Sequence, residues 1–291
     1  MTTPAIIEAA INGATRKADN PHVPVTAEEI AADALACLEA GASIIHNHIG
    51  LVGRDGAEAA EEYLRAWRPV LAQHPDALWY PTVNFGAVDQ RYAHIAPLAA
   101  SGLLRLGLCD PGSLNLGRVV DGLPAGATVY ANSFDDIAVV LGQCRELGLG
   151  PSLAIYEPGF LRTVVAYHRQ GRLPAGAMVK LYLATDRGLT GTAFGLPPTA
   201  RALDAYLELL DGTALPWAVS VVGGDVVDSG MAALALAAGG HVHLGLEFYG
   251  GAAQPTNAEL VAAAGAACAT AGRPVASAAQ AAELLGLPVR S

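Results

Sequence analysis

Short apolar runs alternate with longer segments of helical spacing from one end of the chain to the other. Strands that alternate with helices are typical of α/β proteins, and eight parallel strands can close into a barrel. The pattern therefore predicts a (β/α)8 TIM barrel. The eight expected strands are Ala5–Ile11, Ser43–His48, Leu78–Thr82, Leu103–Gly107, Ser152–Tyr156, Met178–Ala184, Trp217–Val222 and Val242–Leu246.

The segments between these runs carry helix start and stop signals. Thr26 with Glu29 predicts a helix that runs to about Ala40, and Gly41 ends it. A ninth apolar segment, Thr128–Ala131, exceeds the strand count and is interpreted as an extra piece leading into a helix start at Ser133. Further helices are expected at Ala57–His74, Asp135–Leu147, Pro158–Arg169, Thr199–Asp211 and Ser229–Ala238.

A doubly wound open sheet is the alternative α/β architecture. Its nucleotide-binding form has several glycines after the first strand, but Asn12-Gly13-Ala14 holds only one glycine at that place. No segment resembles a linker, so we expect residues 1–291 to form one domain.

Composition adds expectations about partners. Hydrophobic residues make up 52% of the chain and charged residues 15%, so some apolar surface is expected to be buried between subunits. Seventeen basic residues against 27 acidic ones give a net charge of −10, which argues against nucleic acid and anionic membranes as partners. Apolar stretches such as Met231–Ala238 are far shorter than the ~20 residues of a membrane span.

Cysteine usage points to a reducing compartment. The four cysteines have no C-x-x-C spacing, and no signal peptide precedes Pro4-Ala5-Ile6-Ile7. We therefore expect a cytoplasmic protein.

Candidate chemistry is concentrated at the end of the second expected strand. His46 and His48 are two residues apart and point to the same face, so both imidazoles can reach one ion. Active sites of α/β barrels lie at the carboxyl ends of the strands. The pair predicts a divalent metal site, with ordinary hydrogen-bonded histidines at a barrel mouth as the alternative.

A catalytic zinc commonly takes three protein ligands, so a third is expected at a neighbouring strand end. Glu247 closes the last expected strand, which in a closed barrel lies beside the first. The alternative is a surface glutamate at the start of a loop.

In this context the chain resembles the zinc-dependent β-keto acid cleavage enzymes, typified by 3-keto-5-aminohexanoate cleavage enzyme. The resemblance spans most of the chain, and the order of its motifs is specific. The motifs are Asn20-Pro21-His22-Val23-Pro24-Val25-Thr26, Ala40–His48, Gly112-Ser113-Leu114-Asn115-Leu116-Gly117, Met231-Ala232-Ala233-Leu234-Ala235 and Gly245-Leu246-Glu247.

The resemblance implies a TIM barrel, zinc held by His46, His48 and Glu247, and a homotetramer. It also implies that a β-keto acid and acetyl-CoA yield acetoacetate and a new CoA thioester. Ser113 and Asn115 match a substrate-contact region of the family.

The chain departs from its relatives near the expected metal. Relatives follow the metal-binding Glu with an Asp and carry an Arg four residues before it, whereas this chain has Phe248 and His243. Where relatives have an acidic residue in the first loop, this chain has Thr15 or a neighbour. Relatives also have an Arg after the histidine pair, and the stretch that begins at Gly50 lacks it. The stretch after the third strand reads Thr82-Val83-Asn84-Phe85-Gly86.

Three hypotheses remain open. The first is an altered member of the family in which Glu157 or His243 transfers the proton. The second is a zinc enzyme that hydrolyses or hydrates a small substrate. The third is a metal-binding barrel with little catalysis, acting as a sensor or structural subunit.

Several other residues have weaker chemical interpretations. Thr82 and Asn84 could bind a substrate carboxylate or simply form a turn, and Asp110 is read as part of a turn. Lys180 could form a Schiff base as in metal-independent aldolases, although an outward-facing lysine is favoured. Arg187 and Arg201 are the nearest candidates for contacting a CoA phosphate.

Overall fold

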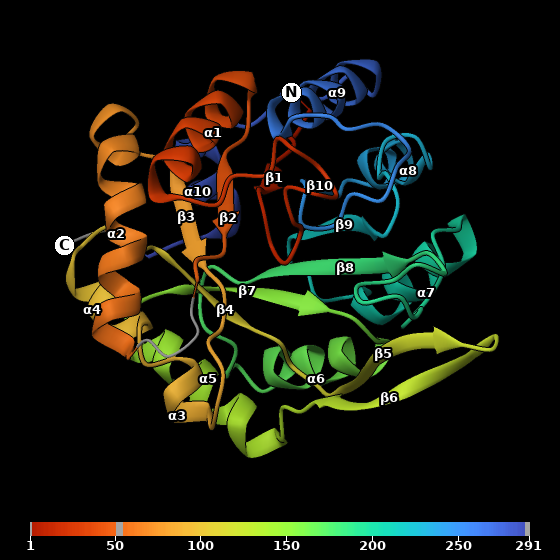
Figure 1. Cartoon of the computed structure of the whole chain (residues 1–291), viewed down its shortest axis with the longest axis horizontal. Coiled ribbons are helices and arrows are strands. Elements are labelled where there is room, and N and C mark those ends of the chain that lie inside the picture. The colour runs from red at the N-terminus through yellow and green to blue at the C-terminus, as the bar shows by residue number, and fades with distance from the viewer. Residues whose placement is uncertain (1, 51–54, 289–291) are drawn as a thin grey trace.

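The computed structural model describes residues 2–50 and 55–288. Its eight parallel strands form a nearly closed barrel in the order β3-β2-β1-β10-β9-β8-β7-β4, which confirms the predicted TIM-barrel architecture (Figure 1). The strands are β1 (Ile7–Ala10), β2 (Ile44–Asn47), β3 (Leu78–Pro81), β4 (Leu106–Cys109), β7 (Gly150–Ile155), β8 (Met178–Ala184), β9 (Trp217–Val222) and β10 (His241–Leu244).

Pairing between β1 and β10 brings the two ends of the chain together. Ile7 lies opposite Val242 and Glu8 opposite His243, while on its other side β1 pairs with β2 through Ala10 and His46. The end of β10 therefore lies one strand away from the end of β2, as the sequence predicts.

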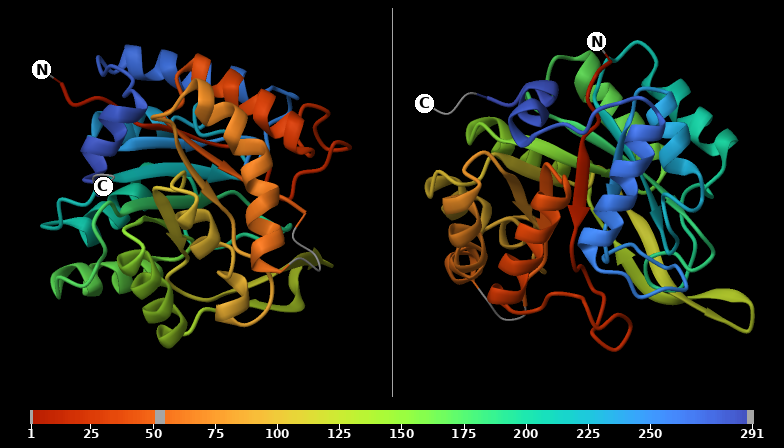
Figure 2. Two further views of the ribbon diagram at one scale, coloured as in Figure 1. Left: turned by 90° about the vertical axis from the view of Figure 1, so that its left-hand side faces the viewer. Right: turned by 90° about the horizontal axis from the view of Figure 1, so that it is seen from above.

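Helices form the outer layer around the strands (Figure 2). Capping explains several of their starts: Thr26, Asp55 and Ser133 each accept a hydrogen bond from the third helical residue. The helices are α1 (Ala27–Ala40), α2 (Gly56–Gln73), α3 (Val88–Arg91), α4 (Ile95–Ala100), α5 (Phe134–Glu146), α6 (Pro158–Arg169), α7 (Ala200–Leu210), α8 (Met231–Ala237), α9 (Asn257–Thr270) and α10 (Ala278–Leu285). In the described ranges, none of them is both long and apolar enough to cross a membrane.

One expected strand needs correction, because the fourth strand begins at Leu106 rather than Leu103, which follows the turn that ends α4. The ninth segment leads into the helix that Ser133 caps, as expected. It also ends an unexpected hairpin of β5 (Leu114–Val120) and β6 (Leu123–Tyr130), which pair antiparallel and extend away from the barrel (Figure 1).

The hairpin arm exposes apolar side chains. Leu123 is 69% exposed, Val129 58% and Val119 51%, although all three are in strands. Large apolar residues in strands are more often buried, so this arm contributes to the apolar surface anticipated from composition.

Candidate active site

Loops at the carboxyl ends of β2 and β10 bring three candidate metal ligands together. Nε2 of His48 lies 3.0 Å from Oε1 of Glu247, and Nε2 of His46 lies 3.3 Å from Oε2 of the same carboxylate. One ligand atom from each residue falls within 4.8 Å of the others. The structure thus brings together the residues that the sequence singled out as a metal-binding group.

Neighbouring backbone contacts fix this arrangement. The Asn12 side chain accepts a hydrogen bond from the His48 N–H (2.8 Å) and donates to the His48 carbonyl (3.0 Å). Thr15 donates to the carbonyl of Leu246, the residue before Glu247. Gly245 has a φ of 127° and would clash with the backbone of Ala10 if it carried a Cβ, so glycine allows β10 to turn closely over β1.

Protonation states in this group suit a cation. Burial lowers the pKa of His46 to about 3, although Glu247 opposes the shift. Burial also opposes ionisation of Glu247, but His48, His46 and Lys180 outweigh it and lower the pKa of Glu247 to about 2. Neutral imidazoles and an ionised carboxylate are the forms that bind a metal.

Unsatisfied polar atoms also fit a metal ion. Within the described ranges, Nε2 of His48 and Oε2 of Glu247 are buried without a hydrogen-bond partner. Nδ1 of His46 lies 3.2 Å from the Tyr80 carbonyl, and donating to it leaves Nε2 as the free lone pair beside Glu247. Such buried atoms are costly unless a ligand engages them, so the donor set fits a divalent cation.

A second polar cluster lies deeper in the barrel, and the sequence interpretation missed it. Glu8 accepts a hydrogen bond from the Tyr80 hydroxyl, and Nζ of Lys180 lies 3.3 Å from Oε1 of Glu8 and 2.5 Å from the Tyr80 oxygen. The favoured outward orientation of Lys180 is wrong, because its side chain is only 4% exposed and is paired inside the barrel. The sequence signal for this pair is that the acidic Glu8 and the basic Lys180 each lie within an otherwise apolar run.

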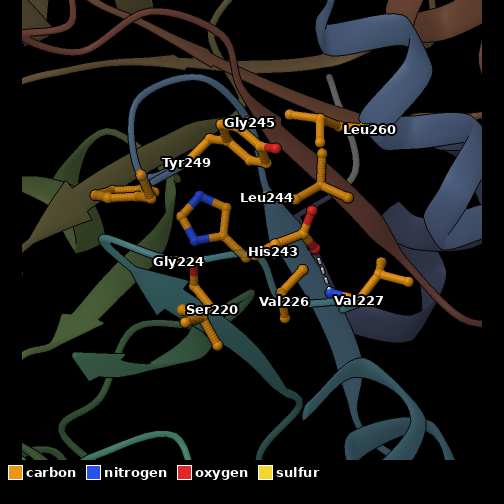
Figure 3. Close-up of a pocket in the computed structure, with 12 residues that line it drawn as sticks. Ser220, Gly224, Val226, Val227, His243, Leu244, Gly245, Tyr249 and Leu260 are labelled. Atoms are coloured by element: carbon orange, nitrogen blue, oxygen red, sulfur yellow. Dashed lines mark hydrogen bonds between the residues drawn. The ribbon is translucent and has the colours of Figure 1, made fainter. Parts of the chain in front are cut away.

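His243 joins this cluster through the same carboxylate. Its Nε2 lies 3.4 Å from Oε1 of Glu8, and its ring packs between Tyr182 and Phe248, with centroids 5.5 Å and 5.1 Å away. Burial and the nearby Lys180 hold the pKa of His243 well below its usual range. Figure 3 shows the His243 ring in a narrow pocket that Ser220 and Tyr249 also line.

A larger pocket of about 550 Å³ opens beside the candidate metal group. Glu247, Phe248 and Thr15 line it. The exposed Arg187 also lines it, and one of its guanidinium nitrogens donates to the Gly250 carbonyl (2.6 Å). The pocket therefore combines the candidate metal ligand with an aromatic ring and a cation.

The other predicted site residues are distributed around the barrel mouth. Asn84 caps the turn after β3 through the Phe85 N–H, and the backbone of Thr82 contacts Tyr63 and His94. Asn115 is exposed in β5. Arg201 is exposed at the start of α7, and residues 51–54 of the departing loop lie outside the described ranges.

Ser113 and Glu157 line a different pocket, together with Phe134 and Phe160. The Glu157 carboxylate accepts a hydrogen bond from the Gly195 N–H at 2.9 Å. Ser113 exchanges hydrogen bonds with the backbone of Asn132. Neither is among the residues that line the pocket beside Glu247.

The chain is similar to known proteins in sequence and in fold. The sequence profile of the family described as beta-keto acid cleavage enzyme matches residues 4–287. The chain is 28% identical to 3-oxoadipate:acetyl-CoA acetyltransferase of Cupriavidus necator, over 99% of this chain and 96% of that protein. It is 28% identical to 3-keto-5-aminohexanoate cleavage enzyme of Fusobacterium nucleatum, over 85% and 83% of the two chains.

Among solved structures, the binary complex of ObcA with oxaloacetate superposes with a TM-score of 0.67. The match covers 92% of this chain and 68% of the other at 17% identity, so it establishes a shared fold.

Proposed function

Because the chain belongs to the β-keto acid cleavage enzyme family, we propose that it is a zinc-dependent acyltransferase using acetyl-CoA. The products are acetoacetate and the CoA thioester of the remaining acyl group. The observation that carries the proposal is the buried group of His46, His48 and Glu247 within a chain that matches the family over nearly its whole length.

The three ligands divide between two strand ends, and each has a distinct part in holding the ion. The neutral imidazole of His46 and the ring of His48 present nitrogens, while Glu247 supplies the negative charge. When bound, zinc polarises a carbonyl oxygen and stabilises enolate charge. Phe248, which is 4% exposed, forms an apolar wall next to this centre and helps to exclude water.

We propose that the pocket beside Glu247 selects the acyl part of the substrate. Phe248 favours a tail that packs on an aromatic ring, so simple straight-chain β-keto acids should react weakly. Arg187 at the same pocket provides a cation for a carboxylate or a CoA phosphate. Glu157, His243, Thr82, Asn84, Ser113 and Asn115 remain proposed contributors to catalysis or substrate binding.

The metal-independent aldolase alternative is weakened by the surroundings of Lys180. A Schiff base needs a neutral amine that the substrate can reach. Lys180 is 3% exposed and lies against Glu8 and Tyr80. A zinc hydrolase remains the main rival, since Phe248 occupies the position where relatives have an Asp.

The test is to incubate the purified protein with acetyl-CoA and a panel of β-keto acids that includes 3-oxoadipate. Acetoacetate and the new CoA thioester should appear in equal amounts, and Glu247→Ala should abolish both. Elemental analysis should find zinc in the wild-type protein. Free acids without any CoA thioester would favour the hydrolase instead, and zinc-free active protein would overturn the proposed metal.

We further propose a cytoplasmic homotetramer. The four cysteines are free and buried, which suits a reducing compartment, and the apolar β5–β6 arm offers surface for subunit contact. Light scattering at micromolar concentration should report a tetramer, and a monodisperse monomer would contradict this assembly.

A further inference from the structure

Phe248 follows Glu247, and a phenylalanine side chain cannot carry a proton, so another group must move it. His243 is fully buried between two aromatic rings and has a depressed pKa, so it is a poor acceptor. Glu8 is 1% exposed and already paired with Lys180. Glu247 belongs to the metal-binding group. Glu157 lines a separate pocket, where its carboxylate accepts a hydrogen bond from the Gly195 N–H, so a further carboxyl group at the barrel mouth comes into question.

Building on the proposed acyl transfer, we propose that Asp110, held by Tyr130, is the catalytic residue that exchanges a proton with C2 of the β-keto acid. Asp110 directly follows β4, so it lies on the same rim of the barrel as the residues that end β2 and β10. The backbone of Asp110 forms part of a turn, since its carbonyl accepts a hydrogen bond from the Gly112 N–H (2.9 Å), and the proposal concerns its side chain.

Tyr130 holds one oxygen of this carboxyl group. The Tyr130 hydroxyl donates to Oδ2 of Asp110 at 2.5 Å. Tyr130 ends β6, so the inserted hairpin delivers this hydroxyl to the barrel mouth. We assign the proton exchange to Oδ1, the oxygen that Tyr130 does not hold.

Aromatic contacts connect this pair to the wall of the substrate pocket. The Tyr130 ring contacts Tyr156 (6.4 Å between centroids), Tyr156 contacts Tyr182 (5.0 Å), and Tyr182 contacts Phe248 (5.0 Å). These contacts form a chain of packed rings from Tyr130, which holds Asp110, to the residue after Glu247. Asp110 is also near enough to Glu247 for the charge of Glu247 to act on it, so we place the substrate between the two carboxyl groups.

Charged and titratable groups from several elements act on Asp110. Burial raises its pKa and outweighs the hydrogen bond from Tyr130 and the nearby Lys180, both of which lower it. Glu247 raises it further, and Arg91 of α3 lowers it. The net result is a raised pKa, which suits a group that must both accept and return a proton near neutral pH.

In the proposed reaction one C–C bond forms, one C–C bond breaks, and one proton leaves C2 and returns to it. Asp110 accepts a proton from C2, C2 bonds to the acetyl carbon of acetyl-CoA, and the CoA thiolate leaves. The thiolate then attacks the original keto carbon, the bond between that carbon and C2 breaks, and Asp110 returns its proton to C2 of the departing acetoacetate. No oxidant or further reactant is needed.

The experiment follows deuterium exchange at C2 by NMR, using a β-keto acid turned over by the wild-type protein, in D2O without acetyl-CoA. Asp110→Asn should lower both exchange and kcat by about 10²–10⁴-fold while zinc content stays at the wild-type level. The exposed residue Asp204 on α7 provides a matched control, and Asp204→Asn should leave both rates unchanged.

Tyr130→Phe tests the pair without removing the carboxyl group. Since the tyrosine lowers the pKa of Asp110, its loss should move the acid limb of the kcat profile to higher pH. Exchange by Asp110→Asn within about twofold of the wild-type rate, or an unmoved limb in Tyr130→Phe, would overturn the assignment. If the wild-type protein neither exchanges C2 protons nor forms acetoacetate, the proposed function fails as well.

Discussion

Two polar clusters inside one barrel differ in how their bonding capacity is used. Around Glu8, the carboxylate meets the Tyr80 hydroxyl and the Lys180 ammonium, so these three groups satisfy one another, although both ring nitrogens of the adjoining His243 have no hydrogen-bond partner among the described residues. Around Glu247, one carboxylate oxygen and a nitrogen of His48 are buried without a hydrogen-bond partner among the described residues. Buried polar groups that the protein leaves unsatisfied point to a ligand, and satisfied ones point to a scaffold.

The clusters also touch, which makes the comparison testable. The Tyr80 ring stacks on His46 with centroids 4.4 Å apart, while its hydroxyl belongs to the Glu8 cluster. A change in one cluster could therefore reach the other.

The largest effect is expected on metal binding. His46→Ala or Glu247→Ala removes one of three ligands and should leave zinc far below one equivalent per chain after dialysis. The loss should exceed the about 10–100-fold that removal of an outer partner causes. Elemental analysis measures it, and full occupancy in both variants would refute the ligand assignment.

Breaking the deeper pair should cost stability rather than metal. Lys180→Met leaves the Glu8 carboxylate buried without its cation, and we expect a loss of about 3–5 kcal/mol in the free energy of unfolding. The double variant Lys180→Met with Glu8→Gln should recover much of that loss. Denaturant unfolding gives both values, and equal losses in the single and double variants would contradict the pairing.

A change at Asn47 should affect stability without affecting metal binding, although Asn47 lies on the same strand as the histidines. It lies between the two histidines but faces away, where its Oδ1 accepts hydrogen bonds from the indoles of Trp67 (2.9 Å) and Trp79 (2.6 Å). Asn47→Ala leaves both donors unsatisfied and should cost about 2–4 kcal/mol. Zinc content per folded chain should remain at the wild-type value, and a loss of metal would show that the two faces of β2 are coupled.

Asp33 is a third carboxylate to compare with Glu8 and Glu247. It is partly buried, and its partner is neutral. It accepts a hydrogen bond from Asn257 at 2.7 Å between α1 and α9, and burial raises its pKa to about 6. Because this value lies above that of an unfolded Asp, about 3.9, protonated Asp33 favours the folded state below about pH 4. That stability is lost as the pH rises from about 4 to 6.

Asp33→Asn should therefore raise the free energy of unfolding at pH 7 by about 1–3 kcal/mol and flatten this part of the pH dependence. Unfolding curves between pH 4 and 7.5 measure the change. A variant that is less stable than the wild-type protein at pH 7 would mean that the ionised carboxylate is better accommodated than its burial indicates.

The barrel could be predicted from the sequence because its strands are apolar runs bounded by helix caps. The group of His46, His48 and Glu247 was accessible for the same reason, since strand periodicity and barrel closure fix where those residues point. The hairpin was not, because exposed strands such as β5 lack the apolar pattern of the barrel strands. None of the expected strands covers its first half, β5.

Side-chain pairing across the barrel was equally hard to anticipate. Glu8 and Lys180 meet although they are far apart in the sequence, and strand registers are needed to place them in one layer. Asp110 presented the same difficulty, because its hydroxyl partner comes from the unanticipated β6.

Because β1 and β10 close the barrel, the metal ligands at the two ends of the sequence become available at different times during synthesis. A ribosome adding about 5–20 residues per second makes His48 roughly 10–40 s before Glu247. Throughout that interval β1 has no partner on the side that β10 will occupy. Because its third ligand arrives with the final strand, the metal-binding group can be completed only when the barrel closes, so metal uptake would report the end of folding in a newly made chain.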